Sequence, residues 1–196
     1  MSRWVQSGVT NRSWMCFVDG ENLTARGQHF ASEHGLTLLG GRYWKKDRFL
    51  WLPTFTPQSM MLHEASFPLA EPVRSYYYTA LNGDDDAVAA VRESLWALGF
   101  EPAVFKKRGE RSKGVDLTLA RDLLSHAFQG HFDVACILAG DADYVPLVEE
   151  VKRPGKTVCV CFFETDGLAN DLRLAADAFY PLDAAFEKAW QSGFAT

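Results

Sequence analysis

Residues 132–144 read FDVACILAGDADY, and the rest of the chain is organised around this stretch. Its apolar run, residues 134–138, predicts a strand buried on both faces, because apolar residues do not alternate with polar ones. The run ends at Ala139 and Gly140, and two aspartates follow, Asp141 and Asp143, of which Asp143 is the expected N-cap of the next helix. Carboxylates at such a junction are costly unless a cation or a hydrogen-bond network compensates them. The junction is therefore the first candidate for a functional site.

The pattern of a buried strand followed by a helix recurs on both sides of this stretch. We expect strands at about residues 14–18, 73–81, 101–105, 134–138, 156–163 and 179–182, and helices at about 21–34, 87–98, 114–129, 144–154, 167–178 and 184–190. This alternation predicts an α/β fold with a mostly parallel central sheet and helices on both faces, since right-handed crossovers cover the sheet. The 196 residues, 47% of them hydrophobic, are expected to form one domain, residues 1–196.

Residues 36–69 interrupt the alternation and predict a hairpin-like insertion followed by a loop. In it, basic and aromatic side chains interleave: Arg42, Lys45, Lys46 and Arg48 with Tyr43, Trp44, Phe49 and Trp51. Cations beside aromatic rings suit single-stranded nucleic acid, whose bases stack on the rings. The alternative is a solvated flap whose aromatic residues pack on the core, and the sequence leaves both open.

Asp19 follows the first expected strand, at its carboxyl end, where open α/β sheets bind ligands. Its alternative role is that of a turn or helix-cap residue. Capping is also the expected role of the triplet Asp84, Asp85 and Asp86, which precedes a helix, with a metal site as the alternative.

In the expected helix at 114–129, the helical period separates two aspartates. Asp116 recurs with apolar residues at i+4, i+7 and i+11, which predicts an acid on a buried stripe, with a first-turn cap as the alternative. Asp122 points about 120° away from that stripe and is expected to be ordinary surface charge.

Brought to one rim of the sheet, four acids would repel one another unless a divalent cation neutralised them: Asp19, Asp116, Asp141 and Asp143. Oxygen-only ligands favour Mg²⁺ or Mn²⁺. Such a site can activate water and stabilise the charge on a displaced phosphodiester, so phosphodiester hydrolysis is the simplest reaction that uses every part. A dense basic loop after the third strand would supply phosphate contacts at that rim: Lys106, Lys107, Arg108, Arg111 and Lys113.

The composition limits which partners and which cellular location we expect. A net charge of −5 argues against a protein that coats nucleic acid nonspecifically, but leaves room for a local basic groove. No stretch approaches the ~18 apolar residues of a membrane span, and the first residues lack the apolar core of a secretory signal, so we expect a cytoplasmic protein without membrane contact. The cysteines lie in apolar runs and are expected to be reduced core thiols: Cys16, Cys136, Cys159 and Cys161.

Five stretches, in this order, carry a family resemblance: FVDGENL (17–23), SYYYTA (75–80), KGVDLTLARDLL (113–124), DVACILAGDADYVPLVEEVKRPGKTVCV (133–160) and LRLAADAFYPL (172–182). With them the chain resembles the NYN domains of the PIN-like nuclease superfamily, particularly the bacterial LabA-like group. The resemblance implies a PIN-like three-layer sandwich and a Mg²⁺- or Mn²⁺-dependent ribonuclease site.

By position, the resemblance assigns metal binding and catalysis to Asp19, Asp116, Asp141 and Asp143. Asn22 matches the asparagine that orients the first acid or the substrate, and Lys113 matches a lysine expected to contact phosphate. Ala139 and Ala142 depart from the pattern, because the group commonly carries serines there. The hydroxyl contacts of those serines are missing, which points to weaker activity.

The leading hypothesis is therefore a metal-dependent endoribonuclease acting on single-stranded RNA. A second hypothesis, which the missing hydroxyls favour, is an RNA-binding or regulatory module that keeps the acidic pocket but does not cleave. A third takes Asp141 and Asp143 as the Asp-x-Asp motif of a metal-dependent glycosyltransferase, and leaves Asp116 and Lys113 unexplained. Whether the chain forms a homodimer stays open.

Overall fold

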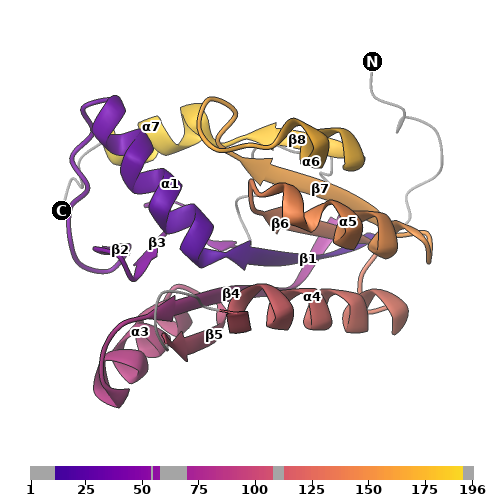
Figure 1. The fold of residues 1–196 in the computed structure, drawn as a ribbon, viewed down its shortest axis with the longest axis horizontal. Helices are drawn as coiled ribbons and strands as arrows, with labels where there is room; N and C mark the ends of the chain where they lie inside the picture. The colour runs from indigo at the N-terminus through magenta and orange to yellow at the C-terminus, as the bar shows by residue number, and fades with distance from the viewer. Residues whose placement is uncertain (1–11, 54, 58–69, 108–112, 192–196) are drawn as a thin grey trace.

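The computed structural model describes residues 12–53, 55–57, 70–107 and 113–191. In this part of the chain, six strands form one sheet in the order β5-β4-β1-β6-β7-β8 (Figure 1). They are β1 (Arg12–Asp19), β4 (Ala70–Leu81), β5 (Glu101–Lys106), β6 (Val134–Leu138), β7 (Thr157–Phe162) and β8 (Ala178–Pro181). Every pairing in the sheet is parallel, which confirms the expected architecture.

Helices cover both faces of the sheet, so the fold has three layers. One hydrophobic core lies under α1 (Gly20–Glu33), α3 (Asp85–Ala97) and α7 (Asp183–Gln191). A second core lies under α4 (Lys113–Phe128), α5 (Val145–Lys152) and α6 (Asn170–Ala175). The strands supply both cores by alternation: in β1, Trp14, Cys16 and Val18 enter the first core, while Met15 and Phe17 enter the second. A strand with two apolar faces is therefore apolar throughout, as the sequence shows.

Two helix starts show where local sequence reasoning held and where it failed. Asp84 caps α3 as expected, because its side chain accepts a hydrogen bond from the backbone N–H of Ala87 at 2.8 Å. Asp143 was expected to cap α5 and does not. The chain first makes a 3₁₀ turn, η1 (Ala142–Tyr144), and Asp141 caps that turn by accepting from the N–H of Asp143 at 3.2 Å.

The helix expected at 167–178 is shorter than predicted, since α6 spans only Asn170–Ala175. Gly167 has a φ of 86°, which is a left-handed conformation outside helical geometry, and Ala176 is extended. The backbone therefore departs from helical geometry on both sides of α6, which limits this helix to six residues.

The insertion at 36–69 contains the expected hairpin, β2 (Trp44–Lys45) paired antiparallel with β3 (Phe49–Leu50); residues 54 and 58–69 lie outside the described part. Phe49 and Trp51 are fully buried, and Tyr43 and Trp44 pack against the same core. Phe49 and Trp51 are therefore unavailable for stacking on bases, which favours the alternative of a flap whose aromatic residues pack on the core.

All four cysteines are free and buried, which confirms the expected core thiols: Cys16, Cys136, Cys159 and Cys161. Each helix in the described part of the chain is too short or too polar to cross a membrane.

Candidate functional site

The strand order places a reversal of winding at the centre of the sheet. From β1 the chain adds β4 and β5 on one side, then crosses back to add β6, β7 and β8 on the other. Open α/β sheets bind ligands in the crevice at the carboxyl ends of the two strands that flank such a reversal, here β1 and β6. Figure 1 shows that α1, α4 and α5 all begin near the end of the sheet where β1 stops.

Asp19 is the last residue of β1, and its side chain is almost fully buried at 5% exposure. One carboxylate oxygen accepts from the backbone N–H of Asn22 at 3.0 Å and so caps α1. The other accepts from the Tyr144 hydroxyl at 2.9 Å. Burial raises the pKa of Asp19 to about 6, against the lowering effect of both hydrogen bonds. Asp19 therefore caps α1, and its burial also destabilises its charged form.

Tyr144 joins two acids that are far apart in the sequence. Its hydroxyl lies 2.9 Å from Oδ2 of Asp19 and 3.2 Å from Oδ1 of Asp116. Burial and the two carboxylates raise the pKa of Tyr144 well above its usual value, so the hydroxyl keeps its single proton. The sequence analysis gave Tyr144 no role in the site. A buried tyrosine three residues after Asp141 was the available signal, because a buried phenol needs a polar partner.

Asp116 lies in the first turn of α4. Its pKa is raised by partial burial first, and then by the negative charges of Glu21, Asp141 and Asp143, while the Tyr144 hydroxyl lowers it. Five carboxylates therefore make up one acidic cluster: Asp19, Glu21, Asp116, Asp141 and Asp143. Asp141 and Asp143 are themselves exposed, at the outer side of this cluster.

Two expectations for α4 were wrong. Asp116 is exposed and lies beside the apolar face rather than on it, since the buried residues of α4 are Val115, Leu119, Leu123 and Ala127. Asp122 is not ordinary surface charge. It accepts a hydrogen bond from the hydroxyl of the buried Tyr78 at 3.2 Å and pairs with Arg121 at 2.7 Å. The buried stripe of α4 begins at Val115, one residue before Asp116.

Glu21, in the first turn of α1, is an acid of the cluster that the sequence reasoning did not select. Its charge raises the pKa of both Asp19 and Asp116. It also forms an ion pair with Lys107 at 2.6 Å, which links the cluster to the expected basic loop. Lys106 instead pairs with Asp85 of α3 at 3.2 Å. Lys113 is the first residue of α4, and Arg108 and Arg111 lie outside the described residues.

The turn that carries Asp141 is held from two sides. The Asn22 side chain accepts from the N–H of Gly140 at 3.1 Å, so Asn22 positions this turn with its side chain and Asp19 with its backbone. The Gly140 carbonyl accepts from Ala169 at 2.7 Å. A Cβ at position 140 would lie 2.3 Å from the carbonyl oxygen of Gly167 and 2.5 Å from the Phe162 ring, so only glycine fits.

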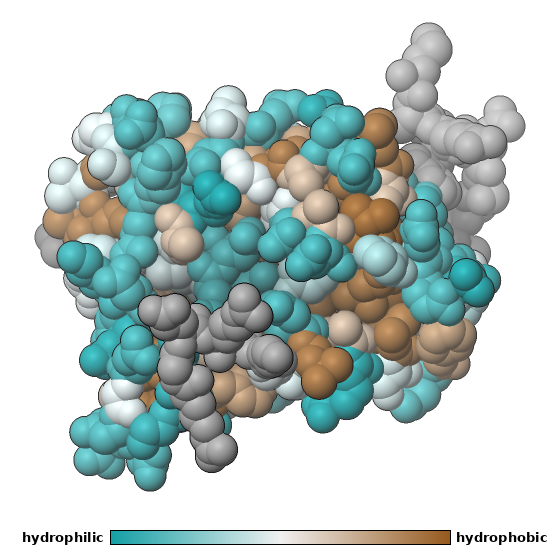
Figure 2. Space-filling model, in the orientation of Figure 1, coloured by the Kyte–Doolittle hydropathy of each residue, from teal (hydrophilic) through white to brown (hydrophobic). Residues whose placement is uncertain are grey.

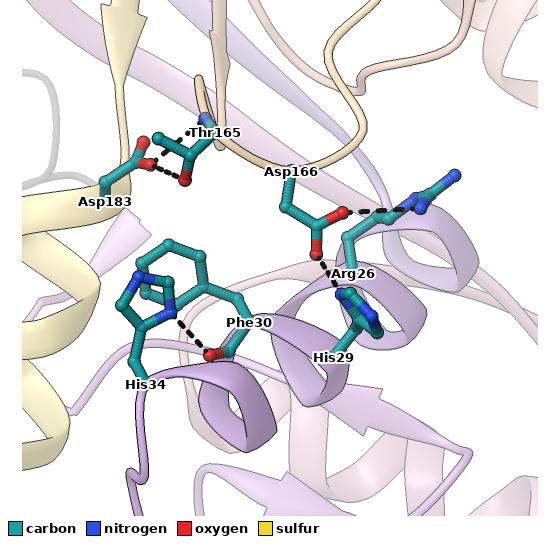
Figure 3. Close-up of polar contacts among 7 residues, drawn as sticks. All are labelled: Arg26, His29, Phe30, His34, Thr165, Asp166 and Asp183. Carbon is teal, nitrogen blue, oxygen red and sulfur yellow. Dashed lines mark hydrogen bonds and ion pairs between the residues drawn. The ribbon is translucent and has the colours of Figure 1, made fainter.

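The loop that contacts Gly140, residues 164–169, is itself anchored to α1 and α7 (Figure 3). Asp166 accepts from Arg26 at 3.3 Å and lies 2.8 Å from Nδ1 of His29. Asp183 accepts from the backbone N–H and the hydroxyl of Thr165. These contacts hold the backbone next to the turn at Gly140 and Asp141 in place. A functional site needs such support, because its side chains must keep fixed positions relative to one another.

The match to a family model covers residues 14–183, which include all four predicted acids. The chain belongs to the NYN domain family. The NYN assignment agrees with the PIN-like α/β sheet and suggests a nuclease-like member of the ribonuclease superfamily; the LabA-like subgroup stays a prediction. No curated protein is significantly similar to this NYN domain in sequence.

Among solved structures, a protein of unknown function from Vibrio parahaemolyticus RIMD 2210633 resembles this NYN domain in fold. The TM-score is 0.64, and the sequences are 20% identical over 93% of this chain and 99% of that chain. At this identity the likeness shows the fold alone.

NYN nucleases generally depend on a divalent metal ion. The oxygen atoms that this site offers as metal ligands are of the kind that such an ion prefers. The candidate ligands are all carboxylate oxygens, which suit a hard cation such as Mg²⁺ or Mn²⁺. Burial and mutual repulsion raise the pKa of Asp19 and Asp116, and a cation between them would remove that penalty. Within the described residues, no three His, Cys, Asp or Glu side chains already lie close enough to hold a metal ion.

The two alanines that replace serines differ in their surroundings. Ala139 is fully buried at the end of β6, whereas Ala142 is exposed between Asp141 and Asp143. Of the two missing hydroxyls, only the one at position 142 would be open to solvent.

Proposed function

We propose that this NYN domain is a metal-dependent ribonuclease that hydrolyses phosphodiester bonds of single-stranded RNA. The observation that carries the proposal is the buried Tyr144 hydroxyl, which lies within hydrogen-bonding distance of both Asp19 and Asp116. These carboxylates come from β1 and α4 and share one hydroxyl beside the reversal of the sheet, where Asp141 and Asp143 add their charges.

Mg²⁺ or Mn²⁺ would be held by Asp19 and Asp116, with Asp141 and Asp143 as direct or water-mediated ligands. When bound, such a cation supplies Lewis-acid stabilisation of the charge on a phosphodiester as it is displaced. Tyr144 keeps the first two carboxylates in place by donating its proton toward them. Because burial puts the pKa of Asp19 at about 6, this acid is a carboxylate at neutral pH and is readily protonated below it.

The basic residues after β5 supply the attraction for the RNA backbone. Lys107 is already next to the cluster through its ion pair with Glu21, and Lys113 opens the helix that carries Asp116. Figure 2 shows hydrophilic residues gathered over α1 and the adjoining strand ends, whereas hydrophobic residues gather where α5 and α6 lie. A polyanion would meet the polar side of the molecule.

The decisive experiment compares two variants of the same helix, Asp116→Asn and Asp122→Asn. Each removes one charge from α4, and each alters a carboxylate that accepts a tyrosine hydroxyl, from Tyr144 and Tyr78 respectively. Mn²⁺-dependent cleavage of a fluorescent single-stranded RNA should fall by about 100-fold or more in Asp116→Asn and stay near wild type in Asp122→Asn. Equal cleavage by both variants would refute the assignment.

A second function, an RNA-binding module that does not cleave, is favoured by one observation. Ala142 is exposed between Asp141 and Asp143, so the hydroxyl that the family resemblance leads us to expect beside these acids is missing. Under this alternative, RNA affinity persists in the presence of EDTA, and no divalent metal produces cleavage.

A further inference from the structure

An open pocket of about 170 Å³ lies between α1, the β2–β3 turn and the end of β4. The side chains that matter for its chemistry are Glu21, Thr24, Gln28, Asp47, Arg48 and Lys107. We infer that this pocket binds one unstacked nucleobase of the RNA strand that lies across the acids. The inference rests on the proposed function and names the feature that gives the site a preference among bases.

The pocket and the acidic cluster share a wall. Glu21 lines the pocket and is only two residues from Asp19, within the turn that Asp19 caps. Its charge also reaches Asp19 and Asp116, since it contributes to the raised pKa of both. A strand with a phosphodiester at the acids therefore has an adjoining base within reach of the pocket.

The charges of the pocket favour a neutral polar ligand. Its two cations, Arg48 and Lys107, are balanced by two carboxylates, Glu21 and Asp47. Lys107 is paired with Glu21 at 2.6 Å, and Asp47 accepts from the Gln28 amide at 3.1 Å. A bare phosphate would meet both carboxylates, whereas a nucleobase is neutral and carries donors and acceptors along one edge.

Arg48 is the residue best suited to hold the base. Among the described residues, its guanidinium has no hydrogen-bond or ion-pair partner, although the side chain is only partly exposed. A guanidinium can stack on a base or donate two hydrogen bonds to it in one plane. The Arg48 backbone is fixed, because its carbonyl accepts from the Thr79 hydroxyl of β4 at 3.0 Å.

The hairpin wall of the pocket is held in place by Gln28 of α1. The side-chain carbonyl of Gln28 accepts from the indole of Trp44 at 3.4 Å and from the N–H of Asp47 at 3.2 Å. The pocket is thus formed before any ligand binds. The hairpin lies in the insertion, outside the five stretches that carry the family resemblance.

The test uses Arg48→Met, which keeps the aliphatic length but removes the guanidinium, with Lys46→Met as the matched control. Lys46 is exposed on the same turn and does not line the pocket. Each protein cleaves a random-sequence single-stranded RNA pool, and sequencing of the products gives the base preference beside the cut. We expect a preference of about 10-fold in wild type and Lys46→Met, reduced to near none in Arg48→Met. An unchanged preference in Arg48→Met would overturn the inference.

A binding measurement separates this inference from the proposed function. In EDTA, wild type should bind a short single-stranded RNA about 10-fold more tightly than an abasic ribose-phosphate strand of equal length, by fluorescence anisotropy. Arg48→Met should bind both equally, and Lys46→Met should behave as wild type. Equal binding of both strands by wild type would refute the base pocket even if the protein cleaves RNA. If cleavage is absent with every metal, the nuclease fails while this measurement still decides the pocket.

Discussion

Replacing Asp19 by asparagine is expected to stabilise the fold and abolish metal-dependent cleavage. In the folded protein, burial raises the pKa of Asp19 from 3.8 to about 6. At about 1.36 kcal/mol per pKa unit, keeping this buried acid ionised costs up to about 3 kcal/mol of folding free energy. Asparagine has the same shape and no charge, so it avoids this cost.

The sign of the pH dependence follows from the raised pKa. Below about pH 4 the acid is protonated in both the folded and the unfolded chain, and Asp19 imposes no penalty. As the pH rises from about 4 through about 6, the unfolded chain releases the proton first and the folded state loses stability relative to it. The advantage of Asp19→Asn should therefore be near zero at about pH 4 and reach its full size near pH 8.

The hydrogen bonds of Asp19 survive this substitution. The amide oxygen of asparagine can still accept from the Asn22 N–H and cap α1. Its NH₂ group would face the Tyr144 oxygen and donate to it, while the Tyr144 proton turns fully to Asp116. The gain in stability therefore comes without a lost cap or an unpaired buried group.

Urea denaturation in EDTA at several pH values measures this effect, with Asp141→Asn as the control. Asp141 is exposed, so its replacement should leave the free energy of unfolding within about 0.5 kcal/mol of wild type. If Asp19→Asn is no more stable than wild type near pH 8, or if its advantage is the same near pH 4, the reasoning about Asp19 is wrong.

Three further substitutions test other parts of the structure by urea or thermal denaturation. Tyr144→Phe removes the donor that lies between two carboxylates and should cost about 2 kcal/mol in EDTA; wild-type stability would contradict the bridge. Gly140→Ala should cost about 1–3 kcal/mol through overpacking, whereas Gly40→Ala, which has open space, should cost little; equal melting temperatures would argue against the tight turn. Hydrogen bonds from Ser13 lower the pKa of Asp133, so Asp133→Asn should lose about 1 kcal/mol near neutral pH, a deficit that shrinks as the pH falls below about 4; a constant deficit would exclude this cause.

The order of the elements and the edge of the sheet that carries the candidate site could be predicted from the sequence. Strands apolar on both faces and capping residues such as Asp84 act over a few neighbouring positions, so their patterns are readable without coordinates. The alternation of strands and helices then required a parallel sheet, and Asp19 and Asp141 had to lie at its carboxyl edge. Even here, local geometry moved the expected cap from Asp143 to Asp141.

Which side chains contact one another in the site could be read only from the three-dimensional arrangement. Tyr144 reaches Asp19 across 125 positions and Asp116 across 28, and such contacts depend on strand order and rotamers rather than on sequence spacing. The same holds for the fate of the insertion, whose rings enter the core while Arg48 lines a pocket beside the acids. Composition could not distinguish rings buried in the core from rings that stack on bases. An aromatic side chain is stabilised by either contact, and the packing of the hairpin decides which one it makes.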